Sequence, residues 1–172
     1  MDYIFSDGLD KVIQLSKKEA FRLKSEFLST EHLMLGIIET DNSAKDILMN
    51  LQADLVQIKR KIENMSVSNP NSLTNPVASI SFTKMADQAI KRAELERRQY
   101  QSSEINTVHL LLAILFKHED PITNVLAAYE IDYERATKEY RIMLKNLGQS
   151  PKMGAYDDDD ERDEYEQMRK PL

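Results

Sequence analysis

The chain has 172 residues, 41% of them hydrophobic, with four glycines, five prolines and neither cysteine nor tryptophan. This composition predicts one folded domain biased towards helix, and the missing cysteines exclude disulfides, thiol nucleophiles and thiolate metal sites. The formal net charge is −6, and residues 156–172, with eight acids and three bases, carry −5 of it. The nearly neutral remainder argues against a nucleic-acid partner, which would require a surplus of Lys and Arg.

The start of the chain does not resemble a targeting signal. Residues 1–7 are acidic where a secretory signal would be basic, and the longest apolar run, residues 110–116, is seven residues long. We therefore predict neither a signal peptide nor a membrane span. A cytoplasmic protein is the simplest expectation, and the absence of cysteine fits a reducing compartment.

Two copies of one helical unit make up most of the sequence. At an offset of 77 residues, the first copy matches the second without a gap from Phe5, which falls on Phe82, to Ile38. After one inserted residue the match resumes at an offset of 78 and places Asp54 on Asp132. A unit of about 60 residues is small for a stable core, so we expect the two copies to pack on each other.

Four helices are predicted in the first repeat, residues 5–65. Apolar residues recur at helical spacing in each of them, and most follow a residue suited to N-capping. The expected elements are a helix from the N-cap Ser6 to Leu23, an irregular segment 24–29, a helix 32–38 capped by Thr30, a short helix 44–51 and a helix capped by Asp54 that reaches Met65. The helix 32–38 is apolar nearly all round, so we expect it to be central and buried.

The second repeat, residues 80–148, follows an exposed connector, residues 66–79, which contains Pro70 and Pro76. Its expected elements are a helix 85–99 capped by Thr83, a helix 108–117 capped by Thr107, a short helix 122–129, and a helix capped by Asp132 that ends at Leu147. Gly148 favours a helix stop. We thus predict a domain over residues 1–148 and a flexible acidic linker over 149–172.

The sequence contains little that would support catalysis, metal binding or nucleotide binding. His32 and His109 occupy equivalent positions at helix starts, which suggests a shared structural role in which one ring nitrogen satisfies a backbone group. No HExxH pattern or Cys/His cluster is present, and the acidic run 157–160 lacks the alternating ligands and central glycine of an EF-hand. None of the glycines belongs to a Walker loop. We expect no metal or other cofactor in this chain and no enzymatic activity.

One segment of the first repeat carries a family signature. Arg22-Leu23, followed seven residues later by the run Thr-Glu-His-Leu-Met-Leu-Gly-Ile-Ile at 30–38, is similar to the RLG…GTEHLLLGL signature of the amino-terminal repeat domain of Clp ATPases, of the ClpA and ClpC type. The likeness covers about residues 5–145, although Ser29 replaces a usual glycine and residues 102–107 depart from the signature. The resemblance implies an all-α fold of two tandem four-helix repeats related by pseudo-twofold symmetry.

The resemblance also implies a function. In such proteins this domain precedes two AAA+ ATPase modules, and it captures unfolded or tagged protein substrates or docks adaptor proteins before delivery to a peptidase. ATP and Mg would then belong to AAA+ modules that this chain lacks. The alternative is a free-standing adaptor or regulator of protein degradation without its own ATPase module.

The candidate site residues follow from the same resemblance. In some ClpC-type relatives the glutamate of GTEH holds the guanidinium of a phosphorylated arginine, while nearby hydroxyls and backbone amides hold the phosphate. Glu31 matches this glutamate, whereas Val108 in the second repeat cannot accept a hydrogen bond, so such a pocket is expected in the first repeat only. Ser6, Thr83 and Thr30 supply candidate hydroxyls, and which of them would serve Glu31 is left open. The alternative roles are a first-turn acid for Glu31 and plain N-caps for Ser6 and Thr83.

Overall fold

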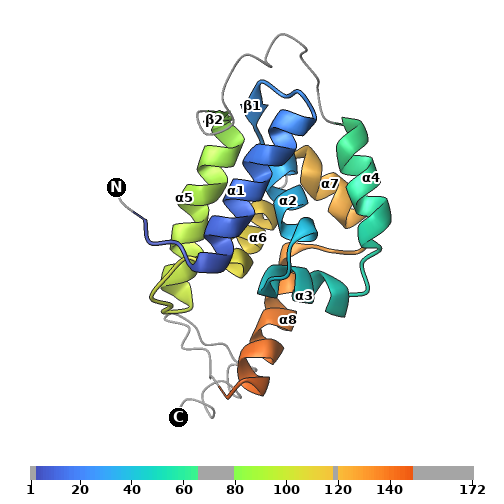
Figure 1. Ribbon diagram of the computed structural model, residues 1–172. Coiled ribbons are helices and arrows are strands. Elements are labelled where there is room, and N and C mark those ends of the chain that lie inside the picture. Colours follow the sequence, from blue (N-terminus) through green and yellow to red (C-terminus); the bar gives the residue numbers. More distant parts are fainter. Residues whose placement is uncertain (1–2, 66–79, 118–119, 149–172) are drawn as a thin grey trace.

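The computed structural model describes residues 3–65, 80–117 and 120–148 (Figure 1). The predicted connector 66–79 and acidic linker 149–172 lie outside the described residues. Within the described residues the chain forms eight helices and two very short strands: α1 (Asp7–Arg22), β1 (Phe27–Leu28), α2 (Thr30–Glu39), α3 (Ser43–Asn50), α4 (Leu55–Met65), β2 (Ser81–Phe82), α5 (Lys84–Gln99), α6 (Thr107–Phe116), α7 (Pro121–Ala127) and α8 (Tyr133–Asn146). The predicted all-α class of two four-helix repeats is confirmed.

The start of each repeat pairs with the segment that precedes the central helix of the other repeat. Strand β1 of the first repeat pairs in parallel with β2 of the second, with Leu28 opposite Phe82. An isolated parallel bridge joins Phe5 to Ile105, which is the same contact with the two repeats interchanged. Such reciprocal pairing is what a twofold relation between the repeats requires. The sequence had predicted an irregular segment where β1 lies.

Helices α2 and α6 form the centre of the core (Figure 1). Every residue of α6 from Thr107 to Leu115 is buried, and so is every residue of α2 from Thr30 to Ile38 except Glu31. Their apolar character on all sides therefore reflects central burial, as predicted for residues 32–38. None of the helices in the described ranges has both the length and the apolar character needed to cross a bilayer.

Most of the predicted N-caps are confirmed, and two are corrected. The side chains of Ser6, Thr83, Asp54 and Asp132 each accept a backbone N–H from the first turn of the following helix. The predictions that Thr30 and Thr107 are N-caps were wrong, because the caps are Ser29 and Asn106, one residue earlier. The two threonine hydroxyls instead make contacts between the repeats. Gly148 ends α8 with a φ of 80°, as its position predicted.

Helices α1 and α2 approach closely at Gly36. A Cβ atom at this position would lie 2.5 Å from Ser16 Oγ and 2.6 Å from the carbonyl oxygen of Val12. The Ser16 hydroxyl donates to that same carbonyl at 2.7 Å, which fixes both groups in place. The packing of the two helices thus depends on the absence of a side chain at residue 36.

A buried carboxylate joins helices α5 and α8 of the second repeat. Glu96 of α5 is 0% exposed, and its Oε2 accepts hydrogen bonds from Arg92 Nη2 and from the Tyr133 hydroxyl, both at 2.8 Å. The Arg92 guanidinium also lies 3.6 Å from the centroid of the Phe116 ring, a cation–π contact that links this pair to α6. Burial, together with the Glu96 charge, raises the pKa of Tyr133 to about 12.

Replacing Glu96 by alanine should lower the free energy of unfolding more than replacing its counterpart in the first repeat, Glu19. We expect Glu96→Ala to lower the free energy of unfolding by about 2 kcal/mol, because Arg92 and the Tyr133 hydroxyl lose a buried partner. The matched control is Glu19→Ala, since Glu19 pairs with the half-exposed Arg22 and should cost under about 1 kcal/mol. Urea denaturation of both variants measures the difference, and equal losses would show that burial of the pair is unimportant.

Candidate functional site

The start of α5 lies against the segment that leads into α2. The backbone N–H of Thr83 donates to the Leu28 carbonyl oxygen at 2.8 Å, and the Thr83 Oγ1 accepts the Ala86 N–H at 3.1 Å. Leu28 precedes Glu31 by three residues and is fully buried. The second repeat therefore brings a hydroxyl-bearing N-cap to the part of the first repeat that contains Glu31.

Ser6 is the counterpart of Thr83 in the first repeat, and it lies against the segment that leads into α6. Its N–H donates to the Ile105 carbonyl oxygen at 2.9 Å, and its Oγ accepts the Leu9 N–H at 3.1 Å. Ile105 precedes Val108 by three residues. The structure thus groups Thr83 with the Glu31 segment and Ser6 with the Val108 segment, a choice that the sequence left open.

Thr30 faces the interior and makes a hydrogen bond between the two repeats. Its Oγ1 donates to Asp120 Oδ1 at 3.0 Å, and the same carboxylate oxygen caps α7 by accepting the Ile122 N–H at 3.1 Å. In the other repeat the Thr107 hydroxyl oxygen accepts the backbone N–H of Ala44 at the start of α3, at 3.2 Å. Thr30 and Asp120 are both buried, so this hydroxyl supports the start of α2 from within.

Glu31 and Val108 show how the two repeats have diverged. Both occupy the second position of a central helix, but Glu31 is partly exposed whereas Val108 is 0% exposed. The carboxylate of Glu31 stands in the first turn of α2, where the helix dipole favours an anion. A charged group is therefore present at this helix start in the first repeat and absent at the equivalent residue of the second.

The two equivalent histidines have the structural role that the sequence predicted. His32 Nδ1 accepts the backbone N–H of Ser29 at 2.9 Å, and His109 Nδ1 accepts that of Asn106 at the same distance. These are capping-box contacts in which histidine takes the place of the usual Glu or Gln. Burial lowers the pKa of both rings to about 4, so they are neutral at physiological pH.

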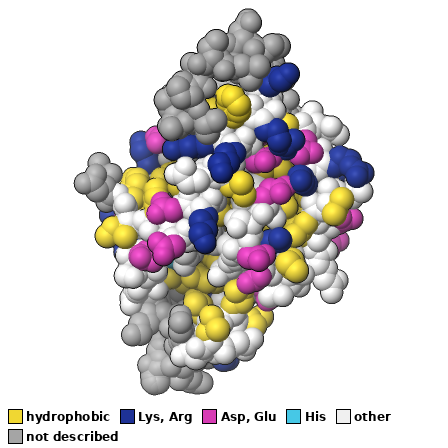
Figure 2. All heavy atoms as spheres, in the orientation of Figure 1, with side chains coloured by type: hydrophobic (Ala, Val, Ile, Leu, Met, Phe, Trp, Pro, Cys, Tyr) yellow, Lys and Arg dark blue, Asp and Glu magenta, His cyan; other side chains and the backbone are white. Residues whose placement is uncertain are grey.

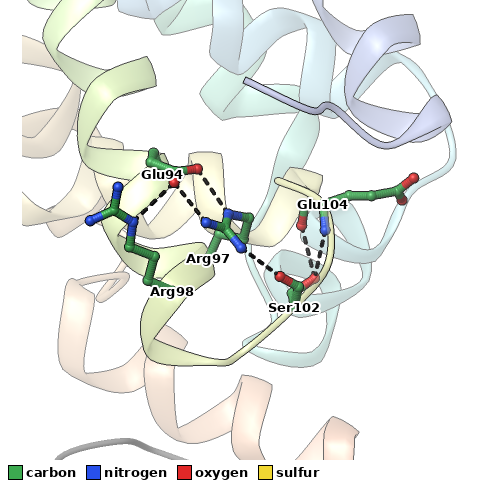
Figure 3. A network of polar contacts seen from close by, with 5 residues as sticks. All are labelled: Glu94, Arg97, Arg98, Ser102 and Glu104. Carbon is green, nitrogen blue, oxygen red and sulfur yellow. Dashed lines mark hydrogen bonds and ion pairs between the residues drawn. The ribbon is translucent and has the colours of Figure 1, made fainter. Parts of the chain in front are cut away.

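A surface network that the sequence analysis did not single out braces the loop before α6 (Figure 3). Glu94 bonds both Arg97 and Arg98, at 2.7 and 3.0 Å, and these hydrogen bonds, led by that from Arg97, lower the pKa of Glu94 to about 2. Arg97 also donates to the Ser102 carbonyl oxygen at 2.8 Å, and the Ser102 hydroxyl donates to the backbone carbonyl oxygen of Glu104. The spacing of Glu94 and its arginines along one helix was the available signal.

The first repeat braces the equivalent loop differently. There Ser25 Oγ lies 3.1 Å from His32 Nε2, whereas Ser102, the counterpart of Ser25, turns towards its own loop. The Nε2 of His109 is buried without a hydrogen-bond partner among the described residues. No group of three or more His, Cys, Asp or Glu that could hold a metal ion occurs in the described part of the chain.

The fold and these contacts define an all-helical double-repeat domain in which each central helix begins against the other repeat. Comparison with known proteins identifies it: the model of the Clp repeat (R) N-terminal domain matches residues 4–129. The chain belongs to this family.

Similar proteins agree with this assignment. A probable ATP-dependent Clp protease ATP-binding subunit of Chlamydia pneumoniae is 31% identical over 146 residues, which cover 83% of this chain and 16% of that protein. The chaperone protein ClpB of Oceanobacillus iheyensis is 26% identical over 152 residues, covering 87% of this chain and 18% of that protein. The chain therefore spans less than a fifth of the length of these two relatives.

The fold also matches solved structures. The Hsp104 N-terminal domain of Candida albicans superposes with a TM-score of 0.68 over 86% of this chain and 94% of that one, at 17% identity. The N-terminal domain of the chaperone ClpD of Arabidopsis thaliana gives a TM-score of 0.65, also at 17% identity, over 82% of this chain and 94% of that one. At such identities the likeness shows a shared fold.

Proposed function

We propose that this chain is the substrate- and adaptor-recognition domain of a cytoplasmic Clp unfoldase, and that it binds proteins without catalysis. Its family and the names of its curated relatives, a Clp protease ATP-binding subunit and a chaperone, support the proposal. Its partners would be unfolded or tagged proteins, adaptor proteins, and the AAA+ ring and peptidase to which it belongs. ATP and Mg would act in those ring modules.

Within this function we propose a phosphoarginine pocket in the first repeat. The observation that carries it is the hydrogen bond from Thr83 N–H to the Leu28 carbonyl oxygen, because it puts an N-cap hydroxyl and the start of α5 beside the Glu31 segment. A carboxylate can accept a guanidinium in a bidentate pair, and a helix start favours a phosphate. Glu31 would take the guanidinium and Thr83 the phosphate, while Thr30 positions α2 through Asp120.

A binding experiment tests the pocket. We expect a fluorescently labelled disordered protein to bind more tightly when its arginines are phosphorylated, as measured by anisotropy titration. Glu31→Ala should weaken binding of the phosphorylated form by about tenfold or more, because a charge-assisted hydrogen bond contributes about 1.5–3 kcal/mol. Thr83→Ala should act in the same direction.

Ser6→Ala is the matched control for Thr83→Ala. Both substitutions remove an N-cap hydroxyl and should cost similar stability, about 1 kcal/mol, but Ser6 lies beside Val108 and should leave binding unchanged. Equal affinity for the two forms of the labelled protein, or equal losses in the Ser6 and Thr83 variants, would refute the pocket. Adaptor docking or capture of unfolded chains would then remain as the recognition mode.

A further inference from the structure

The outer face of α1 carries an open groove that the proposed pocket does not use. Its volume is about 360 Å³, and it is lined by Asp10, Lys11, Gln14, Leu15, Lys18 and Thr40. Leu15 is partly buried and forms an apolar floor, and Lys11 and Lys18 are exposed beside it. Figure 2 shows that basic and acidic side chains are interspersed on the face that α1 crosses. The lysines of the groove are therefore not part of a larger basic patch on this face.

The lysines of this groove have no ionic partners in the part of the chain that the structure describes. Lys11 and Lys18 form no salt bridge there, whereas Lys45 pairs with Asp41 and Lys59 pairs with Glu39. The groove therefore combines an apolar floor with two lysines that form no salt bridge among the described residues and with one carboxylate, that of Asp10, so that its charged lining side chains sum to +1. An acidic segment with interspersed apolar residues has the complementary chemistry.

The equivalent face of the second repeat carries its basic side chains in ion pairs. Arg92 takes the place of Leu15, and its side chain is held by Glu96 and the Phe116 ring. Lys91, which takes the place of Gln14, pairs with Asp87 at 3.2 Å. The two copies of the unit thus differ on this face, because the basic side chains are paired on α5 and form no salt bridge at Lys11 and Lys18 of α1.

The chain itself contains an acidic segment of the matching kind. Residues 156–172 hold eight acids and three bases, together with apolar residues such as Tyr165 and Met168. Eight residues separate Gly148 from Asp157 and can span about 27 Å when extended. A folded body of this size has a radius of gyration of about 15 Å and is about 40 Å across. Residues 149–168 together can span about 66 Å when extended, so the acidic segment is long enough to reach the groove.

We propose that the acidic segment 157–168 docks in the α1 groove of its own chain, with its carboxylates at Lys11 and Lys18 and an apolar side chain over Leu15. The attraction is between exposed charges and is weak, but the tether supplies an effective concentration of the order of millimolar. Docking of this kind is screened by salt. A groove occupied in this way is shielded from other acidic chains until they displace the segment.

Paramagnetic NMR on the 172-residue chain tests the proposal. Because the chain contains no cysteine, Gln167→Cys provides a single site for a nitroxide label. At low ionic strength the amide signals of residues 10–18 and Thr40 should lose intensity relative to those on the outer face of α5. The loss should disappear at about 1 M salt, where the Debye length falls to about 3 Å.

Charge variants of the labelled chain make the test specific. The double variant Lys11→Ser with Lys18→Ser should abolish the broadening of α1. The matched control, Lys91→Ser with Lys138→Ser, removes the same charge from α5 and α8 and should leave it intact. Broadening that is absent from α1, persists without Lys11 and Lys18, or grows with protein concentration because the label belongs to a second copy would overturn the proposal.

Discussion

Gly36→Ala should lower the free energy of unfolding by about 3 kcal/mol, although alanine is the better helix former by about 1 kcal/mol. The new methyl group would lie 2.6 Å from the Val12 carbonyl oxygen, which is backbone and cannot rotate away, and 2.5 Å from Ser16 Oγ. Helices α1 and α2 would have to separate, and the buried contacts between them would loosen. Chemical denaturation measures this loss, and the m-value of the variant should equal that of the parent chain.

The second repeat supplies the control for this substitution. Ala113 occupies the position equivalent to Gly36, and it coexists with Ala89 and Ala93, which take the places of Val12 and Ser16. Smaller side chains on α5 thus accompany a larger one on α6. Adding Val12→Ala and Ser16→Ala to the Gly36 variant should recover part of the stability, because α1 could then shift over the new methyl group. A Gly36→Ala variant as stable as the parent would show that the close approach is unimportant.

Acidification should destabilise the domain through its two buried histidines. The pKa of His32 and His109 is about 4 in the folded chain and about 6.5 when unfolded, so the unfolded state binds more protons between these values. The stability is therefore fully present above pH 6.5 and is lost as the pH falls towards 4, by up to about 3 kcal/mol for each ring. Urea midpoints measured from pH 7.5 to pH 5 would record the slope.

Glutamine provides the control for the histidine prediction. In His32→Gln with His109→Gln, the amide oxygen can accept the same backbone N–H groups of Ser29 and Asn106, as Gln does in an ordinary capping box, but it does not titrate. The variant should remain folded and lose most of its pH dependence between pH 7.5 and pH 5. An unchanged slope would assign the acid sensitivity to other groups.

The surroundings of the two histidines show one way in which the two repeats have diverged. His32 has Ser25 within hydrogen-bond distance of its second nitrogen, whereas the second nitrogen of His109 is buried without a partner among the described residues. In the second repeat Arg97 and Glu94 brace the loop instead. The capping contact is thus retained in both copies while the support around the loop has changed.

Much of the fold could be read from local patterns. Helical periodicity and N-cap side chains act over three or four residues, so Ser6, Thr83, Asp54 and Asp132 were correctly placed at helix starts. The repeat also predicted two four-helix units, and the equivalent positions of the two histidines predicted their shared contact with the backbone. These features depend on residues that are near one another in the chain.

The tertiary structure decided which distant residues meet. Thr83 lies beside the Glu31 segment, Thr30 bonds Asp120 across the repeats, and Glu96 is buried, none of which a local pattern specifies. The two-residue strands escaped prediction for the same reason, because each exists only through a partner more than fifty residues away. The sequence alone determined the helices, most of their caps and the two repeats, since the forces that set them are local. The candidate site arises only where the packing of one repeat on the other brings separate helix starts together.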